Sequence, residues 1–271
     1  MNTTSRRHKK STKKKATGGG KAGEVIMLRG LYIRTKMLDE YGAKRQIAIH
    51  VASKYVKDFD AVLLDAGSTA EMIAEEMFAR RKFLSVLTNN MGAYAAYTRA
   101  RELMAAHARN EEDPPNRGNE LLITGGRYVD VYESLLGAGA SASIKDFIPN
   151  IIIIGTSGLR SEEGVFCHGS EESAVKELLW TKPTDLRLIA TDWTKIGKRD
   201  AHAFGPLENL RLNAKQAVVV TCEPPKEMYE EAPAVMQAFE NQIKKMEKSN
   251  ILVERIPVLD LPFPEPVALP L

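Results

Sequence analysis

The sequence predicts a single α/β domain with a mainly parallel, Rossmann-like sheet flanked by helices, and three observations support this prediction. Short apolar runs rich in β-branched residues alternate with longer segments of helical periodicity. Four consecutive isoleucines at 151–154 are typical of a strand that is buried on both faces, as in a parallel sheet. The hydrophobic fraction of 44% is ample for such a core, and no apolar run reaches the length of a membrane span.

The elements follow one another in a regular order. The first helical pattern covers 31–60, where apolar residues fall at helical spacing: Ile47, Ile49, Val51, Tyr55 and Val56. The predicted strands are apolar, β-branched runs at 61–64, 83–87, 120–124, 150–154, 186–190, 217–221 and 251–256. The predicted helices between them are 69–80, 91–106, 140–147, 171–181 and 228–248.

The last predicted helix has one apolar face. Its members at helical spacing are Val235, Met236, Phe239, Ile243 and Met246. Such a face most often packs on its own domain, and a dimer surface is the alternative. The sequence therefore leaves a homo-oligomer open.

Both ends of the chain differ in composition from the body. Residues 1–23 hold eight Lys or Arg and no acid, so the tail supplies +8 to the net charge of +3 and the rest of the chain carries −5. We do not expect an acidic body to bind nucleic acid. The tail is predicted to be disordered, although it could contact nucleic acid without sequence preference. Residues 257–271 are predicted to form a proline-rich C-terminal extension. The predicted domain between the two ends covers residues 24–256.

The cysteines and the N-terminal sequence favour a cytoplasmic protein without metal or cofactor. Cys167 and Cys222 are too few for a disulfide scaffold. Cys167 precedes His168, but one such pair is weak evidence for zinc, and a cysteine nucleophile would need a partner that the sequence cannot place. No apolar stretch follows the charged N-terminus, so no secretory signal is visible.

Small polar residues follow five of the predicted strands. These segments are 65–69 (DAGST), 88–90 (TNN), 124–127 (TGGR), 155–158 (GTSG) and 191–195 (TDWTK). Ligands of open α/β sheets bind beyond the carboxyl ends of the strands, where glycine N–H groups, hydroxyls and helix N-termini suit an anion. The same residues also serve as ordinary helix caps. Their repetition at five strand ends predicts a crevice for a phosphorylated or polyhydroxyl ligand.

The order of these segments resembles a known family. The segments LLDAGSTAEMIAEEM, LSVLTNN, ELLITGGRYVDVYESLLGAGA, IIIIGTSGLRSEEGV, EESAVKELL and ATDWTKIGKRDAHAFGPLENL are similar to the C-terminal effector domain of DeoR-type transcriptional regulators, which is related to the ribose-5-phosphate isomerase fold. The match covers about residues 42–221. The resemblance implies a pocket for a phosphorylated sugar or sugar-derived metabolite, in a regulator and not in an enzyme.

The resemblance also implies the residues that bind the ligand. They are Asp65, Gly67, Ser68, Thr69, Thr88, Asn89, Gly125, Gly126, Gly155, Ser157, Glu172, Lys176, Asp192 and Lys195. Lys176 follows Glu172 at i,i+4 on one helix face, so an exposed ion pair is the alternative interpretation of these two residues. Lys176 or Lys195 could neutralise a phosphate as a point charge.

Two features depart from the family's pattern. DeoR-type regulators carry a winged helix-turn-helix before this domain, and the residues before Gly42 show no second helix or wing. We therefore expect a sensor domain without its own recognisable DNA-binding module, which acts through its tail, as a homo-oligomer or in a hetero-assembly with a DNA-binding regulator. Trp193 stands in the 191–195 turn, where we expect it to narrow or cap the pocket.

A sugar-phosphate isomerase is the alternative function. Asp65, Glu133 or Asp192 would then supply the general base, as proton transfer beside a carbonyl requires. The acidic and glycine-rich turns of the isomerase, of the types Asp-Gly-Ala-Asp and Lys-Gly-Gly-Gly, do not occur in this chain. We therefore favour the sensor over the enzyme.

Overall fold

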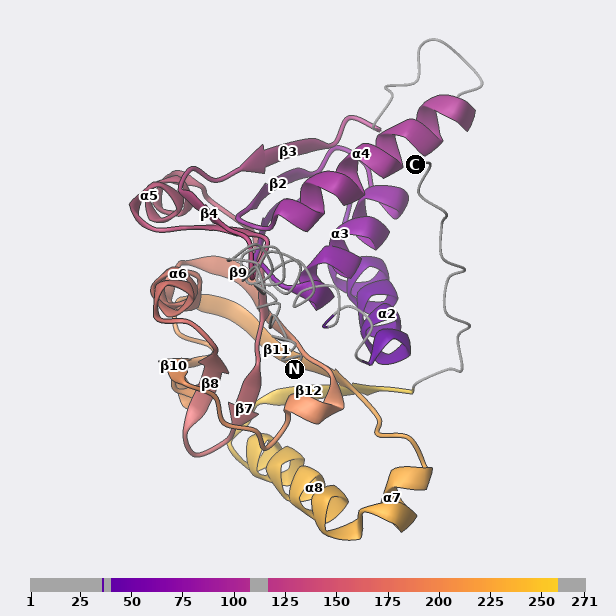
Figure 1. Ribbon diagram of the computed structural model, residues 1–271, viewed down its shortest axis with the longest axis vertical. Coiled ribbons are helices and arrows are strands. Elements are labelled where there is room, and N and C mark those ends of the chain that lie inside the picture. The colour runs from indigo at the N-terminus through magenta and orange to yellow at the C-terminus, as the bar shows by residue number, and fades with distance from the viewer. Residues whose placement is uncertain (1–35, 37–39, 108–116, 258–271) are drawn as a thin grey trace, which may run out of the picture.

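The structure is a computed structural model that describes residue 36 and residues 40–107 and 117–257 (Figure 1). The predicted basic tail at 1–23 lies outside these residues, and so does the proline-rich extension apart from residue 257. Residues 108–116 lie outside them as well.

A seven-stranded parallel sheet forms the centre of the molecule, with the strand order β12-β11-β9-β6-β1-β2-β3. Its strands are β1 (Ala61–Leu64), β2 (Ser85–Thr88), β3 (Glu120–Ile123), β6 (Ile151–Gly155), β9 (Thr184–Ala190), β11 (Ala214–Cys222) and β12 (Leu252–Ile256). All seven predicted strands are present near their predicted bounds, and the prediction of an α/β fold with a mainly parallel sheet is confirmed.

The four isoleucines occupy the middle strand of the sheet. Ile153 of β6 lies opposite Leu64 of β1 on one side and Leu188 of β9 on the other. All four side chains are buried, because helices cover both faces of the sheet. The edge strand β3 instead alternates exposed and half-buried residues. The continuous apolar run therefore marked the centre of the core correctly.

Helices lie on both faces of this sheet (Figure 1). On one side lie α2 (Tyr41–His50), α3 (Ser68–Arg80) and α4 (Met91–His107). On the other side lie α5 (Ala138–Asp146) and α6 (Ser170–Thr181). The helix α2 continues into a π-helical turn, Val51–Tyr55. Its buried face includes Ile47, Val51 and Val56, as the helical spacing predicts.

Two small antiparallel sheets were not predicted. The strands β4 (Arg127–Val129) and β5 (Ser134–Leu136) form a hairpin, and β7 (Gly158–Arg160), β8 (Gly164–Cys167) and β10 (His202–Gly205) form a three-stranded sheet. The 155–158 segment therefore leads into β7 and not into a helix. These strands escaped prediction because they are short and contain glycine and charged residues, which give no β-strand pattern. Gly164 is required here: its φ is +107°, and a Cβ would lie 2.4 Å from the Gly205 oxygen.

The predicted helix at 228–248 is two helices, which corrects its N-terminal boundary. The helix α7 (Glu227–Glu231) ends at Ala232, and α8 (Pro233–Lys248) begins with a proline at its first position. Proline suits the first turn of a helix but cannot continue the one before it. Met236, Phe239, Ile243 and Met246 are buried against the domain, whereas Val235 is exposed and lies outside this face.

Among the described residues, no helix is long and apolar enough to cross a membrane. The remaining helical turns are η2 (Trp193–Lys195) and η3 (Leu207–Asn209).

Candidate ligand-binding site

A cavity lies at the carboxyl ends of β1, β6 and β9, which are neighbours in the sheet. Most residues that the family resemblance implied border it. They are Gly67, Ser68, Thr69, Gly155, Ser157, Glu172, Lys176, Asp192 and Lys195. The five others, Asp65, Thr88, Asn89, Gly125 and Gly126, do not line the cavity.

The turn between β1 and α3 presents the first turn of a helix to the cavity. Gly67 adopts a φ of +127°, which residues with a side chain rarely adopt, and α3 begins at Ser68. Ser68, Thr69 and Ala70 border the cavity. The first N–H groups of a helix have no acceptor within the helix and carry a positive partial charge. This turn therefore suits an anionic group.

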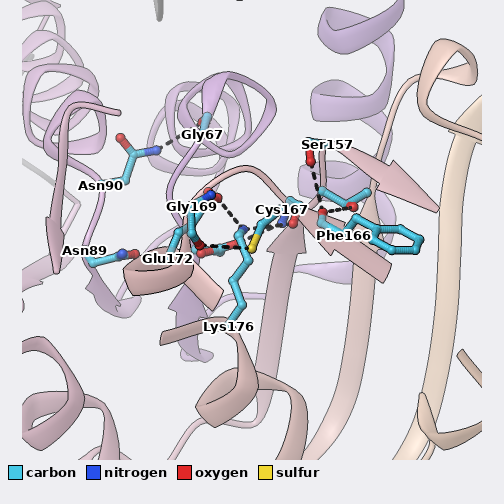
Figure 2. A network of polar contacts seen from close by, with 12 residues as sticks. Gly67, Asn89, Asn90, Ser157, Phe166, Cys167, Gly169, Glu172 and Lys176 are labelled. Carbon is cyan, nitrogen blue, oxygen red and sulfur yellow. Dashed lines mark hydrogen bonds and ion pairs between the residues drawn. The ribbon is translucent and has the colours of Figure 1, made fainter. Parts of the chain in front are cut away.

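The turn is fixed from the next strand. The Asn90 side chain points toward Gly67 and its Nδ2 donates to the Gly67 oxygen at 3.2 Å (Figure 2). Asn90 follows β2, and its Oδ1 accepts from the N–H of Gly92 at 2.9 Å. One side chain thus joins the starts of α3 and α4, which makes the Gly67–Thr69 turn rigid.

A buried ion pair lies at the centre of the site. Lys176 Nζ donates to Asp65 Oδ2 and, at 2.9 Å, to the oxygen of Gly155, and lies 3.4 Å from Glu172 Oε1. Figure 2 shows Lys176 extending from α6 beside Glu172. Asp65 and Lys176 are each 1% exposed. The Glu172–Lys176 pair is therefore formed, but it is largely buried and not the exposed pair considered as the alternative.

The carboxylates of Asp65 and Glu172 determine the protonation state of Lys176. Burial alone would lower the pKa of Lys176, but Asp65 and Glu172 outweigh it and hold the pKa above its usual range. Lys176 therefore stays protonated, with hydrogen bonds to Asp65 and to the Gly155 oxygen and an ion pair with Glu172. Asp65 Oδ2 also accepts from the N–H of Gly155 at 3.0 Å. The pair thus joins β1, β6 and α6 beneath the cavity.

The 191–195 turn supplies a second cation. It forms the helical turn η2, in which Asp192 Oδ1 accepts from the N–H of Thr194 at 3.0 Å. Lys195 lines the cavity with its Nζ 3.8 Å from Asp192 Oδ2. Trp193 is buried but does not line the cavity, so the expectation that it caps the pocket is wrong. Its side chain contacts α2 instead, because its Nε1 donates to Glu40 Oε2 at 3.0 Å.

The segments after β2 and β3 hold the β4–β5 hairpin in place. The oxygen of Asn89 accepts from the N–H of Leu135 at 2.8 Å, and Asn89 Nδ2 donates back to the Leu135 oxygen at 3.3 Å. Gly126 has a φ of +121°, and a Cβ there would lie 2.6 Å from the oxygen of Leu136. Asn89 and Gly126, which the resemblance assigned to ligand binding, thus position the hairpin.

The hairpin contributes two cavity residues that the sequence did not reveal, Tyr132 and Ser134. Ser134 is 1% exposed, and its Oγ has no hydrogen-bond partner among the described residues. A buried hydroxyl in this state is costly unless a ligand or water satisfies it. His168 also borders the cavity; its ring lies against Tyr132 at 6.4 Å and its Nδ1 is 3.3 Å from Asp200 Oδ1.

The helix α2 contributes a third lysine that sequence reasoning missed. Lys44 is 2% exposed, lines the cavity and donates from Nζ to the oxygen of Lys36, which lines it too. A signal was present, because Lys44 stands three residues before Ile47 and seven before Val51 on the apolar face. A charged residue on such a face indicates a functional or paired group.

The structure gives no support to thiol or metal chemistry among the described residues. Burial raises the pKa of the Cys167 thiol to about 12, so the thiol stays protonated and is a poor nucleophile. Within residues 40–107 and 117–257, no group of three or more metal-binding side chains occurs.

Of the three carboxylates considered for an isomerase, Asp192 lines the cavity and Asp65 and Glu133 do not. Asp65 is held by Lys176 and the Gly155 N–H, and Asp192 accepts hydrogen bonds from Thr194. Glu133 does not line the cavity. This arrangement favours a binding site over a proton-transfer site.

Comparison with known families decides the assignment. A family model described as the DeoR C terminal sensor domain matches residues 39–213. The chain belongs to the DeoR C-terminal sensor domain family. The resemblance of the strand-end segments is thereby confirmed, over a range that includes every lining residue except Lys36.

Curated relatives of this DeoR-family chain are transcriptional regulators. The chain is 28% identical over 177 residues to the HTH-type transcriptional regulator GlpR of Haloferax volcanii, covering 65% of this chain and 62% of the relative. It is 24% identical to the HTH-type transcriptional regulator IolR of Bacillus subtilis, over 67% and 62%. It is 23% identical to the lactose phosphotransferase system repressor of Staphylococcus aureus, over 77% and 74%. These relatives agree with a regulator and not an enzyme.

The match spans only part of these proteins, about three fifths of the length of GlpR and IolR.

Among solved structures, the chain is similar to ribose 5-phosphate isomerase A from Methanocaldococcus jannaschii, with a TM-score of 0.37 and 13% identity over 58% of this chain and 56% of that one. It is also similar to the eIF2B-β2-δ2 complex from C. thermophilum, with a TM-score of 0.38 and 19% identity over 62% and 49%.

Proposed function

We propose that this DeoR-family sensor domain binds a phosphorylated sugar or a sugar-derived phosphorylated metabolite in the cavity, and that binding regulates transcription. The observation that carries the proposal is the meeting of a helix N-terminus with lysines from two other elements. The first turn of α3, Lys44 of α2 and Lys195 of η2 all border one cavity. Such a combination of backbone N–H groups and ammonium groups suits a phosphate.

The remainder of the cavity supports a hydroxylated ligand. Ser134, Ser157 and the carboxylates of Glu172 and Asp192 line the same space. Carboxylates and hydroxyls are the groups that accept and donate hydrogen bonds to sugar hydroxyls. One relative is named as the repressor of a lactose phosphotransferase system, which makes sugar-derived ligands the first class to test.

A binding screen on the full chain tests the proposal. Phosphorylated trioses, pentoses and hexoses would be titrated beside the same sugars without phosphate, with thermal shift and calorimetry as readouts. We expect stabilisation only by phosphorylated compounds, because a ligand that binds the folded state raises its stability by mass action. If no phosphorylated compound changes the unfolding temperature or releases heat, the proposal is wrong.

The ligand affinity of a cavity variant tests whether the ligand binds in this cavity. Lys195→Met removes a cavity ammonium, and we expect a loss of about ten- to a hundredfold in affinity, since a hydrogen bond to a charged group contributes about 1.5–3 kcal/mol. Lys198→Met is the matched control, because Lys198 is an exposed lysine just beyond η2 that does not line the cavity. Equal affinities of the two variants would place the ligand elsewhere.

Two wider parts of the function are proposals as well. We infer that the protein acts in the cytoplasm, as a homo-oligomer or together with a DNA-binding regulator. Any contact between the basic tail and nucleic acid involves residues 1–23, which lie outside the described residues. Light scattering of the full chain at several concentrations, with and without ligand, measures its assembly.

A further inference from the structure

The start of α2 reaches the cavity through Lys44. This side chain is 2% exposed although it belongs to a helix near the beginning of the described chain. Its ammonium group is held at the cavity by the oxygen of Lys36, which precedes the helix. A residue of the segment that enters the domain is thus part of the wall that faces the ligand.

The same helix is joined to the cavity a second time, through Trp193. The indole Nε1 donates to Glu40 Oε2 at 3.0 Å, and Glu40 is the residue that caps α2. Glu40 has a φ of +53°, a conformation that costs energy for a residue with a side chain and persists where surrounding contacts hold it. Trp193 lies between Asp192 and Lys195, which both line the cavity.

We propose that a bound anion is shared between Lys44 of α2 and Lys195 of η2, and that the Trp193–Glu40 hydrogen bond couples this occupancy to the segment that enters α2. The proposal rests on the proposed function, since it needs an anionic ligand in the cavity. It names the route by which the ligand changes the rest of the chain. Neither Lys44 nor Glu40 belongs to the loops that follow the strands.

The physical argument concerns two elements that a ligand can join. The start of α2 and η2 are joined by a neutral donor on a carboxylate, the indole N–H of Trp193 on Glu40. An anion between the ammonium groups of Lys44 and Lys195 adds charged hydrogen bonds in a partly buried site, where they are stronger than neutral ones. Both contacts favour the same arrangement of α2 against η2, so each one stabilises the other.

Hydrogen exchange on the full chain tests this coupling. The probes are inorganic phosphate and glucose 6-phosphate, with calorimetry on the same samples to measure binding. We expect ligand to slow the exchange of the amides of residues 40–44 by at least about threefold, because the first turn of α2 opens less often when the anion holds it. We expect Lys44→Met to weaken binding by at least about tenfold.

A matched pair of variants isolates the Trp193 hydrogen bond. Trp193→Phe keeps a buried ring but removes the donor to Glu40. Trp180→Phe makes the same change at the other tryptophan, whose Nε1 has no hydrogen-bond partner among the described residues. We expect the ligand-induced protection at residues 40–44 to fall by at least half in Trp193→Phe and to persist in Trp180→Phe. Glu40→Met, which removes the acceptor, should behave as Trp193→Phe, and the double variant should lose no more than either.

The outcomes separate the two proposals. Binding without a change in exchange at residues 40–44, equal protection in the two tryptophan variants, or unchanged affinity of Lys44→Met would each overturn the coupling and leave the sensor function standing. If no phosphorylated compound of the screen binds the unmodified chain, the sensor function and the coupling both fall. Slowed exchange that depends on Trp193 and not on Trp180 supports the coupling.

Discussion

At the level of single residues, Lys176 owes its role to burial. From the sequence it could have been an exposed partner of Glu172 or a phosphate ligand. Folding places its ammonium against Asp65, Glu172 and the Gly155 oxygen, with almost no exposure to solvent. Lys176 thus stabilises the floor of the cavity through its contacts with the protein, and Lys44 and Lys195 line the same cavity.

Loss of Lys176 should therefore be costly to the fold. We expect Lys176→Met to lower the free energy of unfolding by about 3–5 kcal/mol, because Asp65 would remain as an uncompensated buried charge. Urea unfolding at pH 7 measures the change. Lys215→Met is the control, since its pair with Asp185 is mostly exposed, and it should cost less than about 1 kcal/mol. Recovery of stability in the Lys176→Met, Asp65→Asn double variant would confirm the cause; equal costs at 176 and 215 would contradict it.

Glu71 is a second buried charge, on α3 below the ligand turn. Its carboxyl lies against Gly92 at the start of α4, where a Cβ would be 2.1 Å from Glu71 Oε2. Burial, together with the charges of Glu75 and Glu133, raises the pKa of Glu71 to about 7 against the opposing charge of Arg99. The folded protein thus holds this proton up to about pH 7, whereas the unfolded chain releases it at its ordinary pKa of 4.5.

This difference predicts a pH dependence of stability. Because the folded state binds the extra proton, the contribution of Glu71 is fully present below pH 4.5 and is lost as the pH rises through about 7. The loss amounts to at most about 3 kcal/mol, at 1.36 kcal/mol per pKa unit. We expect Glu71→Gln to be more stable than the unmodified protein at pH 8, with little gain at pH 4.5. Glu102→Gln, at an exposed position on α4, should show no such change between the two pH values in denaturant unfolding. A gain for Glu71→Gln that does not vary with pH would contradict the prediction.

At the level of elements, the β4–β5 hairpin explains the predicted residues that do not line the cavity. Asn89 and Gly126 fix the hairpin by backbone contacts, and the hairpin in turn carries Tyr132 and Ser134 to the cavity. A side chain that follows a strand can thus serve the site through another element. The sequence located the important segments and missed the element that they support, because three-residue strands give no periodic pattern.

Substitution of a glycine tests the importance of the hairpin. Gly126→Ala adds a Cβ that meets the Leu136 oxygen at 2.6 Å in a backbone conformation that alanine rarely adopts. Gly137→Ala is the control, because its φ of +92° carries similar strain but a Cβ meets no atom within 4 Å. We expect both variants to lose about 1–3 kcal/mol from strain, and only Gly126→Ala to lose ligand affinity as well, by at least about tenfold. Calorimetric titration with the tightest ligand of the screen measures this, and equal affinities would show that the hairpin does not shape the site.

At the level of the whole molecule, one parallel sheet carries both the core and the cavity. Its two-sided burial requires helices from both ends of the chain, and α8 packs with its apolar face on the same domain. The apolar face of α8 is therefore accounted for by packing within a single chain. The predicted bounds of the domain, 24–256, stay a prediction.

A shortened chain tests those bounds. We expect a protein of residues 24–256 to keep the unfolding temperature of the full chain within about 4 °C, which corresponds to about 1–2 kcal/mol in a domain of this size. Its affinity for phosphorylated sugars should also be unchanged. A variant that unfolds at a much lower temperature would show that residues outside the described core contribute to the fold. Circular dichroism during heating provides the measurement.

The strands, their order along the chain and the polar segments at their carboxyl ends follow from the sequence alone, because β-branched runs, helical spacing and glycine-rich turns are local patterns. The lining of the cavity does not follow from such patterns. It depends on contacts between distant parts of the chain, such as the hydrogen bond from Trp193 to Glu40, 153 residues apart, and the burial of Lys44 in the wall of the cavity. Which polar residues face the ligand is decided by packing, since only packing determines which of them solvent can reach.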